Sequence, residues 1–302
     1  AGCRRAYTAA RRDRAPAHPC AAPLASQVAV KKQVRDQEQL ETYLLRELAV
    51  LNYVRHENML EYIGAYNEVD PQGATHAVYI VTEIAAGGDL MSLLLSERAL
   101  GWRFLTKICH GAAAGLEYLH SHNLIHRDIK SSNLLLDARW KCKIADFGLC
   151  REVAPDDEQM STCGTDEYMA PELHFDEPYG FAVDVFSFGM VLVECIARRK
   201  VGADGFCARS PAQRFEMDLD SVRALASERG APPSLTELAC QCGSYEPDER
   251  PITADALAWL SDLSDELAAD GAAPDPPEPP APSALLAEGE GEDDAAAAAA
   301  AA

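Results

Sequence analysis

The stretch HRDIKSSN at positions 126–133, followed by ADFG at positions 145–148, organises the interpretation of the whole chain. Four of its side chains carry a charge or an oxygen atom that can bind a metal ion: Asp128, Lys130, Asn133 and Asp146. A polar loop between a helix and a hairpin is the plain structural alternative, but such a loop has no need of these residue types at this spacing. The stretch therefore predicts a reactive site.

These four side chains together suit the transfer of a phosphoryl group to a hydroxyl. Asp128 could accept or orient the hydroxyl proton, and Lys130 could place a positive charge near the γ-phosphate. Asn133 and Asp146 could supply oxygen ligands to Mg²⁺, which prefers one or two carboxylates together with phosphate oxygens and water. ATP and Mg²⁺ are therefore the expected cofactors.

The stretch resembles the catalytic loop and the metal-binding motif of eukaryotic protein kinases. The resemblance covers residues 28–260 and implies an α+β, two-lobed kinase-like fold. Its N-lobe is small, β-rich and partial here, and its C-lobe is large and helical. The resemblance also implies ATP and protein substrates with Ser or Thr as partners, and direct in-line transfer of the γ-phosphate with Asp128 as the catalytic base.

Composition divides the chain into four parts. Residues 1–25 are an Ala-, Arg- and Pro-rich leader that is expected to be disordered, with an organellar transit peptide as the alternative. Residues 26–84 are expected to form the partial N-lobe, and residues 85–262 the C-lobe. Residues 263–302 are rich in Pro, Ala and acidic residues, cannot build a core, and are expected to be disordered.

The chain has 302 residues, of which 48% are hydrophobic, and this is enough for one large domain or two lobes around a cleft. No long apolar run occurs, so no membrane span is expected. The ten scattered cysteines are typical of reduced thiols and favour a cytoplasmic protein. Much of the net charge of −21 lies in the C-terminal part, where eleven acidic residues and no basic ones follow from Asp262 onward. The acidic balance argues against a nucleic acid partner.

One part of the kinase pattern is not found in this sequence. In the family, a Gly-rich loop covers the ATP phosphates shortly before the strand that carries a lysine. Here no glycine lies between Gly2 and Gly64, so the loop and the two strands that hold it are missing or unrecognisable. Each lost charge-assisted hydrogen bond to phosphate would cost roughly 1.5–3 kcal/mol. A non-catalytic pseudokinase scaffold and a fragment without its true loop are the two alternatives to an active kinase.

Residues 28–31 alternate like a strand that ends on Lys31, and residues 36–54 carry leucines at helical spacing. Glu47 lies on the flank of that helix, sixteen residues after Lys31, where the family has its partner glutamate. The resemblance implies that Glu47 positions Lys31 on the α- and β-phosphates and that Ala29 lines the nucleotide site.

The apolar residues 79–81 predict another strand, which leads into the segment that joins the two lobes in the family. The resemblance implies that Thr82 lies at the back of the adenine pocket and that Glu83 and Ala85 offer backbone contacts to adenine. Leu135 belongs to the same implied nucleotide site. A buried strand followed by a glycine turn is an equally valid description of this segment.

Residues 164–172, GTDEYMAPE, resemble the end of the kinase activation segment. A phosphate on this segment would find a cation in Arg127, beside the catalytic base. Ser161 is the first expected phosphorylation site and Thr162 the second, which implies an upstream activating kinase. Thr165 is expected to serve substrate docking. Unmodified loop hydroxyls are the alternative for each of them.

Further residues carry expectations about the large lobe and about the branch of the family. Asp184 begins a buried helix and in the family braces the catalytic loop, and Arg250 is placed to pair with Glu172. Lys130 and Thr165 are similar to the residues of serine/threonine kinases. The C-terminal half is similar to the tyrosine-kinase-like group, and within it to the LIM kinase and testis-specific kinase branch.

Overall fold

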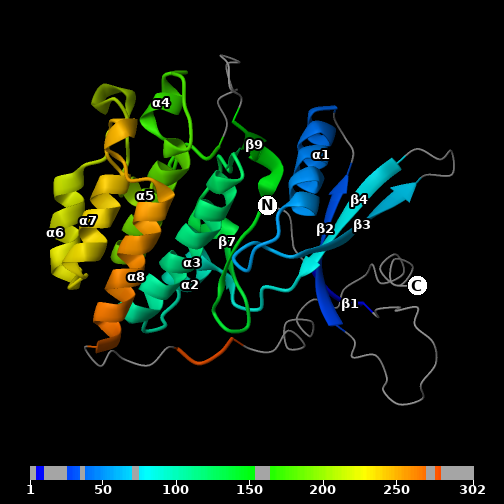
Figure 1. The fold of residues 1–302 in the computed structure, drawn as a ribbon, viewed down its shortest axis with the longest axis horizontal. Coiled ribbons are helices and arrows are strands. Elements are labelled where there is room, and N and C mark those ends of the chain that lie inside the picture. The colour runs from blue at the N-terminus through cyan, green and yellow to red at the C-terminus, as the bar shows by residue number, and fades with distance from the viewer. Residues whose placement is uncertain are drawn as a thin grey trace.

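The computed structural model describes residues 5–9, 26–34, 38–69, 75–153, 164–269 and 276–279. Within these residues, a β-sheet covered by one helix stands beside a larger helical body (Figure 1). This arrangement confirms the predicted α+β class, with a small β-rich lobe followed by a large helical lobe.

The smaller lobe is built on a four-stranded antiparallel sheet with the strand order β1-β2-β4-β3. Its strands are β1 (Arg5–Ala9), β2 (Ser26–Val34), β3 (Tyr62–Val69) and β4 (Thr75–Glu83). Lys31 on β2 lies opposite Ile80 on β4, which is buried. Because directly opposite residues share one face of a sheet, Lys31 points toward the covered face rather than toward solvent.

Part of the leader belongs to this sheet, so the prediction that residues 1–25 are wholly disordered is wrong. Strand β1 pairs with β2, with Arg5 opposite Val30 and Ala9 opposite Ser26. Pairing of this kind satisfies backbone N–H and C=O groups along the edge of β2 and requires no hydrophobic period in the added strand. Composition alone therefore does not reveal it.

Helix α1 (Glu38–Tyr53) covers one face of the sheet, close to the predicted range 36–54. Its buried face includes Leu44 and Leu51, each 3% exposed, whereas the adjacent Leu45 is 57% exposed. Positions seven residues apart return to the same side of a helix, so this stripe fixes which way the helix faces. Glu47 lies on that buried face and is thereby directed at the sheet.

The helices of the larger lobe in the described residues are α2 (Leu90–Leu95), α3 (Trp102–Ser121), α4 (Pro171–His174), α5 (Ala182–Ala197), α6 (Leu219–Arg229), α7 (Pro233–Cys242) and α8 (Thr253–Ala269). Its short strands are β5 (Gly88–Asp89), β6 (Leu124–Ile125), β7 (Leu134–Leu136), β8 (Cys142–Ile144) and β9 (Arg151–Glu152). The stretch 126–133 connects β6 to β7. None of the helices in the part of the chain that the structure describes is long and apolar enough to cross a membrane.

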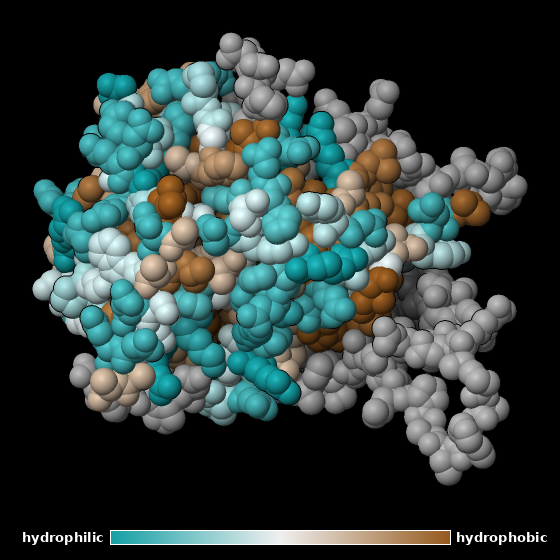
Figure 2. Space-filling view, in the orientation of Figure 1, coloured by the Kyte–Doolittle hydropathy of each residue, from teal (hydrophilic) through white to brown (hydrophobic). Residues whose placement is uncertain are grey.

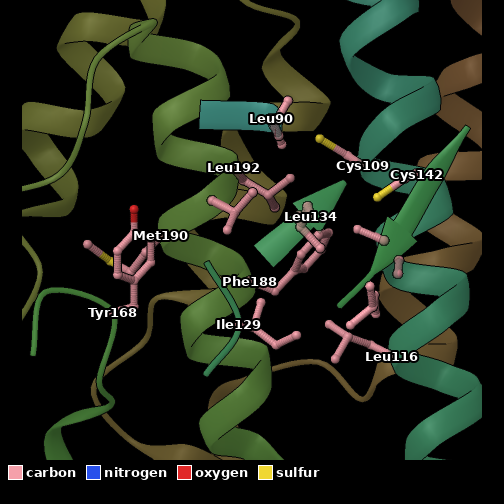
Figure 3. Packing of buried hydrophobic residues seen from close by; sticks show 14 of the residues in the cluster. Leu90, Cys109, Leu116, Ile129, Leu134, Cys142, Tyr168, Phe188, Met190 and Leu192 are labelled. Carbon is pink, nitrogen blue, oxygen red and sulfur yellow. The ribbon is translucent and has the colours of Figure 1, made fainter. Parts of the chain in front are cut away.

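Helix α5 is the centre of the large lobe, because its residues 183–197 are all buried. A helix that is apolar on nearly every side must be covered all round. Figure 3 shows Phe188 and Leu192 of this helix packed in the same cluster as Leu134 of β7 and Leu116 of α3. The outer surface of this lobe is largely hydrophilic in the view of Figure 2. Helix α5 thus provides a rigid support beneath the stretch 126–133.

Helix α8 extends to Ala269, so the prediction that the chain is disordered from residue 263 is wrong. Leu260 and Leu263 are 0% and 2% exposed, and Leu267 packs against the same core. Their spacing continues one helical stripe beyond the predicted boundary, and burial of that stripe compensates for the acidic composition around it. Residues 276–279 are described as well and contact the large lobe.

We expect Gly189→Ala, in the middle of α5, to lower the free energy of unfolding by about 1–2 kcal/mol. A Cβ atom there would lie 2.9 Å from Cys242 Cβ and 3.0 Å from the backbone N of Gly243. This overpacking outweighs the gain in helix propensity of about 1 kcal/mol. Urea unfolding measures the change, and Gly180→Ala is the control because its Cβ would meet nothing within 4 Å. Equal stability of the two variants would contradict this account.

Candidate active site

The catalytic stretch is fastened to helix α5 by one buried carboxylate. Asp184 accepts hydrogen bonds of 2.8 Å from the backbone N–H groups of both His126 and Arg127. His120 Nε2 lies 3.0 Å from the same carboxylate. Arg127 has a φ of 65°, a left-handed conformation that a non-glycine residue keeps only where its surroundings hold it. The sequence predicts this bracing role of Asp184.

The buried carboxyl of Asp184 stays ionised because hydrogen-bond donors surround it. Burial alone would raise the pKa of this carboxyl, but the hydrogen bond and charge of His120 and the charge and amide of His126 outweigh burial and leave the pKa below its usual value. A carboxyl with a lowered folded-state pKa stabilises the fold above its unfolded-state pKa. That stabilisation is lost as the pH falls through the folded-state pKa.

We expect Asp184→Asn to lower the free energy of unfolding by about 2–3 kcal/mol near neutral pH. The Asn amide NH₂ would oppose one of the two backbone N–H groups that the carboxylate now accepts. The difference between the two proteins should shrink as the pH falls below the ordinary pKa of an aspartate, about 3.9, toward the lower folded-state pKa of Asp184, because the wild-type carboxyl becomes neutral over that range. Urea unfolding across this pH range measures it, and a pH-independent difference would contradict the assigned charge.

Three predicted residues meet in one closed set of hydrogen bonds. Thr165 Oγ1 donates to Asp128 Oδ1 at 2.8 Å, and Lys130 Nζ donates to Asp128 Oδ2 at 2.7 Å. Lys130 Nζ also donates to Thr165 Oγ1 at 2.8 Å. These two donors fix the direction of the Asp128 carboxylate. The structure therefore brings the activation-segment threonine to the catalytic loop, as the sequence predicts.

The two predicted metal ligands lie at one end of the β7–β8 hairpin. Asn133 directly precedes β7 and Asp146 follows β8, and the backbone N–H of Ala145 donates to the carbonyl of Asn133 at 2.9 Å. The Asn133 amide nitrogen donates to the backbone O and to Oδ2 of Asp128, at 2.8 and 2.9 Å. The Asn133 amide oxygen is thereby the atom of this side chain that could bind a cation. A carboxylate and an amide oxygen are hard donors that fit Mg²⁺.

The predicted pair between the N-lobe lysine and the α1 glutamate is formed. Lys31 Nζ donates to both carboxylate oxygens of Glu47, at 2.9 and 3.2 Å. Gln33, two residues along the same face of β2, also donates to Glu47, at 3.1 Å. Lys31 Nζ lies 3.6 Å from Asp146 Oδ1 as well. Lys31 therefore joins helix α1 to the metal-ligand end of the hairpin.

A pocket between the two lobes is lined by Ala29, Lys31 and Thr82, three of the six predicted nucleotide-binding residues. Its lining consists of Ala29, Val30, Lys31, Glu47, Leu51, Leu60, Ile80, Thr82, Ala145 and Asp146. Leu135 packs with Leu60 and Ala145 in a small apolar cluster beside it, with Ala85 at the margin. An apolar wall with a few convergent charged groups is typical of a small-molecule site.

The segment that joins the lobes presents a specific set of backbone groups. The N–H of Glu83 donates to the carbonyl of Glu61 at 2.9 Å, and the carbonyl of Glu83 accepts from Thr82 Oγ1 at 3.2 Å. The Glu83 side chain bonds Lys143 of β8 at 2.7 Å and thereby ties the sheet to the hairpin. Sequence analysis did not identify this contact, because a glutamate in a linker has no distinctive pattern.

Arg127 is buried against the start of the activation segment. Its Nε donates to the carbonyl of Leu149 at 2.8 Å, and one terminal nitrogen donates to Tyr179 Oη at 3.1 Å. The predicted phosphorylation sites Ser161 and Thr162 lie outside the described residues. The interaction of Arg127 with a phosphate therefore stays a prediction.

A buried glutamate, not predicted from the sequence, links the stretch 126–133 to the segment 164–172. Glu194 of α5 accepts from Ser131 Oγ and Tyr168 Oη, each at 2.6 Å, and from the N–H of Val201 at 2.9 Å. Burial raises the pKa of Glu194 despite these three donors. A lone acid near the end of an otherwise apolar helix is the signal that could have revealed this network.

The predicted pair at the base of the lobe is confirmed. Arg250 donates to both oxygens of Glu172, at 2.6 and 2.9 Å, and both side chains are almost fully buried. The same guanidinium also donates to three backbone carbonyls, those of Ser244, Ala182 and Tyr245. The pair fixes the end of the activation segment against the C-terminal helices.

Comparison with known proteins agrees with this geometry. Residues 20–259 match the protein kinase domain family. The chain is 35% identical over 244 residues to a probable serine/threonine-protein kinase of Dictyostelium discoideum, an alignment that covers 79% of this chain and 55% of that protein. The probable serine/threonine-protein kinase kinY of the same organism is 36% identical over 256 residues, which cover 79% of this chain and 44% of that protein. The chain thus spans about half the length of these curated relatives. It belongs to the protein kinase domain family.

Proposed function

We propose that this chain is a serine/threonine protein kinase that transfers the γ-phosphate of ATP to Ser and Thr hydroxyls of protein substrates. The observation that carries the proposal is the closed set of hydrogen bonds among Asp128, Lys130 and Thr165, with distances of 2.7 to 2.8 Å. These hydrogen bonds hold the carboxylate of Asp128, the ammonium of Lys130 and the hydroxyl of Thr165 next to one another. The names of the Dictyostelium relatives support the same class of substrate.

Each side chain has a definite task in this proposal. Lys31, held by Glu47, grips the α- and β-phosphates. Asp128 orients the substrate hydroxyl and takes its proton as the hydroxyl oxygen bonds to the γ-phosphorus and ADP leaves. Lys130 offsets the negative charge near the γ-phosphate. Positioning and electrostatic stabilisation carry nearly all of the rate enhancement in phosphoryl transfer.

The proposal places the nucleotide in the pocket between the lobes and Mg²⁺ beside the two oxygen-bearing side chains at the end of the β7–β8 hairpin. Adenine enters the pocket beside Ala29, Thr82 and Leu135 and meets the backbone of Glu83 and Ala85. Asn133 and Asp146 hold Mg²⁺, which, when bound, neutralises phosphate charge and orients the transferring group.

A kinase-fold scaffold without catalysis is the second candidate, and one observation favours it. No glycine lies between Gly2 and Gly64, so the loop that covers the phosphates in the family has no recognisable counterpart here. Against the scaffold stands the retention of five chemical types at the site: Lys31, Glu47, Asp128, Asn133 and Asp146. A third candidate is a fragment whose loop lies in preceding sequence.

Regulation and family branch follow from the sequence resemblance alone. We infer that an upstream kinase phosphorylates Ser161 or Thr162 and that the phosphate orders the activation segment against Arg127. We also infer membership of the tyrosine-kinase-like group, near the LIM kinase and testis-specific kinase branch.

Phosphate transfer from γ-labelled Mg-ATP to a generic basic protein tests the proposal, with identification of the labelled amino acid. We expect label on serine and threonine, and we expect Lys31→Met to lose at least roughly 100-fold in rate, since two charge-assisted bonds to phosphate disappear. Lys32→Met is the matched control, because this adjacent lysine pairs with Glu68 on the opposite face of the sheet. Its rate should stay near that of the wild type.

The outcomes separate the candidates. Label on tyrosine alone would overturn the assigned class of substrate. If the wild-type chain transfers phosphate no faster than Lys31→Met, the scaffold and the fragment remain as the two candidates. Repeating the assay with the preceding sequence restored distinguishes these two, because only the fragment gains activity.

A further inference from the structure

A short piece of the proline-rich tail lies against the β7–β8 hairpin, far from it in sequence. Trp140, in the turn of this hairpin, donates its indole Nε1–H to the carbonyl of Pro276 at 3.3 Å. Figure 1 shows the described segment 276–279 as the short orange piece beneath the large lobe, close to the hairpin. Neither the kinase fold nor the proposed catalysis requires this contact.

The indole ring lies in a built site. Trp140 is only 4% exposed, and the ring of Phe104 meets it edge-on at 5.7 Å with an interplanar angle of 89°. The guanidinium of Arg98 lies 5.5 Å from the Trp140 ring centroid. A Cβ atom on Gly87 would come within 3.0 Å of the indole, so the ring packs directly on the backbone there.

The turn that carries Trp140 is held in an unfavourable conformation. Trp140 has a φ of 61°, which costs a bulky L residue roughly 1–2 kcal/mol. The Asp137 carboxylate stabilises the turn by accepting from the N–H groups of Arg139 and Lys141, at 2.7 and 2.8 Å. This arrangement aims the indole ring at the tail segment.

The tail segment has the periodicity of a polyproline II helix. Pro276 and Pro279 are half-buried, whereas Pro277 and Glu278 between them are exposed. A polyproline II helix has three residues per turn, so residues three apart lie on the same side. Proline also restricts φ in the free chain, so little conformational entropy is lost on docking. An aromatic ring with an N–H donor beside a Pro-x-x-Pro segment is a general mode of recognition for such helices.

We propose that Trp140, with Phe104 and Arg98 beside it, is a binding site for a polyproline II helix and that the segment Pro276–Pro279 of this chain is its occupant. The segment follows the end of α8 at Ala269 by only a few residues, so its effective concentration at the site is high and a weak contact suffices. The docked segment joins the C-terminal helix to the hairpin whose second strand leads to Asp146.

The test follows the Trp140 indole N–H signal in the NMR spectrum of the full chain, assigned with Trp140→Phe. Pro276→Ala and Pro279→Ala should each shift this signal and leave the indole signals of Trp102 and Trp259 in place. Glu278→Gln is the matched control, because it changes an exposed residue of the same segment and leaves intact the peptide group between Pro276 and Pro277, whose carbonyl accepts from Trp140. It should leave the Trp140 signal unchanged.

A synthetic peptide of residues 274–282, added to the full-length variant with both Pro276→Ala and Pro279→Ala, should move the signal back toward its wild-type position. The same peptide carrying both substitutions should not. Equal shifts in Pro276→Ala and Glu278→Gln would contradict the proposed periodicity of the segment. An unmoved Trp140 signal in the double variant would contradict the contact itself. All these proteins retain the catalytic residues and the core.

Discussion

Asp128→Asn should reduce phosphate transfer by roughly 10³-fold, within the range typical of the loss of a positioned base. The Asn side chain has nearly the same shape but cannot take up the substrate proton. Both oxygens of the Asp128 carboxylate accept hydrogen bonds: Oδ2 from Lys130 Nζ and Asn133 Nδ2, and Oδ1 from Thr165 Oγ1. The NH₂ group of Asn would face one of these donors and could not accept from it. The loss should appear in kcat, measured at saturating Mg-ATP and protein substrate.

The matched control is Asp137→Asn, which makes the same chemical change outside the site. Asp137 accepts from two backbone N–H groups in the β7–β8 turn and, among the residues that the structure describes, has no hydrogen bond to a candidate active-site residue. We expect its rate to lie within about two-fold of the wild type, since altered stability alone does not change kcat of the folded fraction. A rate for Asp128→Asn above about a tenth of the wild-type rate would remove Asp128 from its role as base.

The sequence predicts which candidate active-site residues lie together, because these residues stand on short, regular connections. Asp128 and Lys130 are two residues apart, and Asn133 and Asp146 flank one hairpin, so local geometry alone brings them together. To predict the contact between Lys31 and Glu47, a strand and an amphipathic helix had to be recognised as well. The hydrophobic spacing indicates which face of each is buried. The structure forms each of these contacts.

Contacts that depend on tertiary packing could not be predicted in the same way. Glu194 joins Ser131 to Tyr168 across three separate elements, and no spacing in the sequence connects them. Strand β1 is held by backbone pairing with β2, to which side-chain patterns contribute little. The docking of Pro276 on Trp140 likewise joins residues that are 136 positions apart.

Arg250→Ala should lower the free energy of unfolding by about 3–5 kcal/mol, the largest effect on stability that we expect from one substitution. The Arg250 side chain is 0% exposed and that of Glu172 is 4% exposed, so removal of the arginine leaves a carboxylate without its counter-ion in the interior. Three backbone carbonyls lose a donor at the same time. Urea unfolding near neutral pH measures the change.

Arg223→Ala is the control, because Arg223 and Glu237 lie 3.8 Å apart with 47% of each side chain exposed. Water replaces that interaction, so we expect a change below about 0.5 kcal/mol. A double variant with Met at positions 250 and 172 should be more stable than Arg250→Ala, since no charge is then left buried. It should stay below the wild type, because the carbonyls of Ser244, Ala182 and Tyr245 still lack their donor. Equal costs for Arg250→Ala and Arg223→Ala would mean that burial does not determine the strength of these pairs.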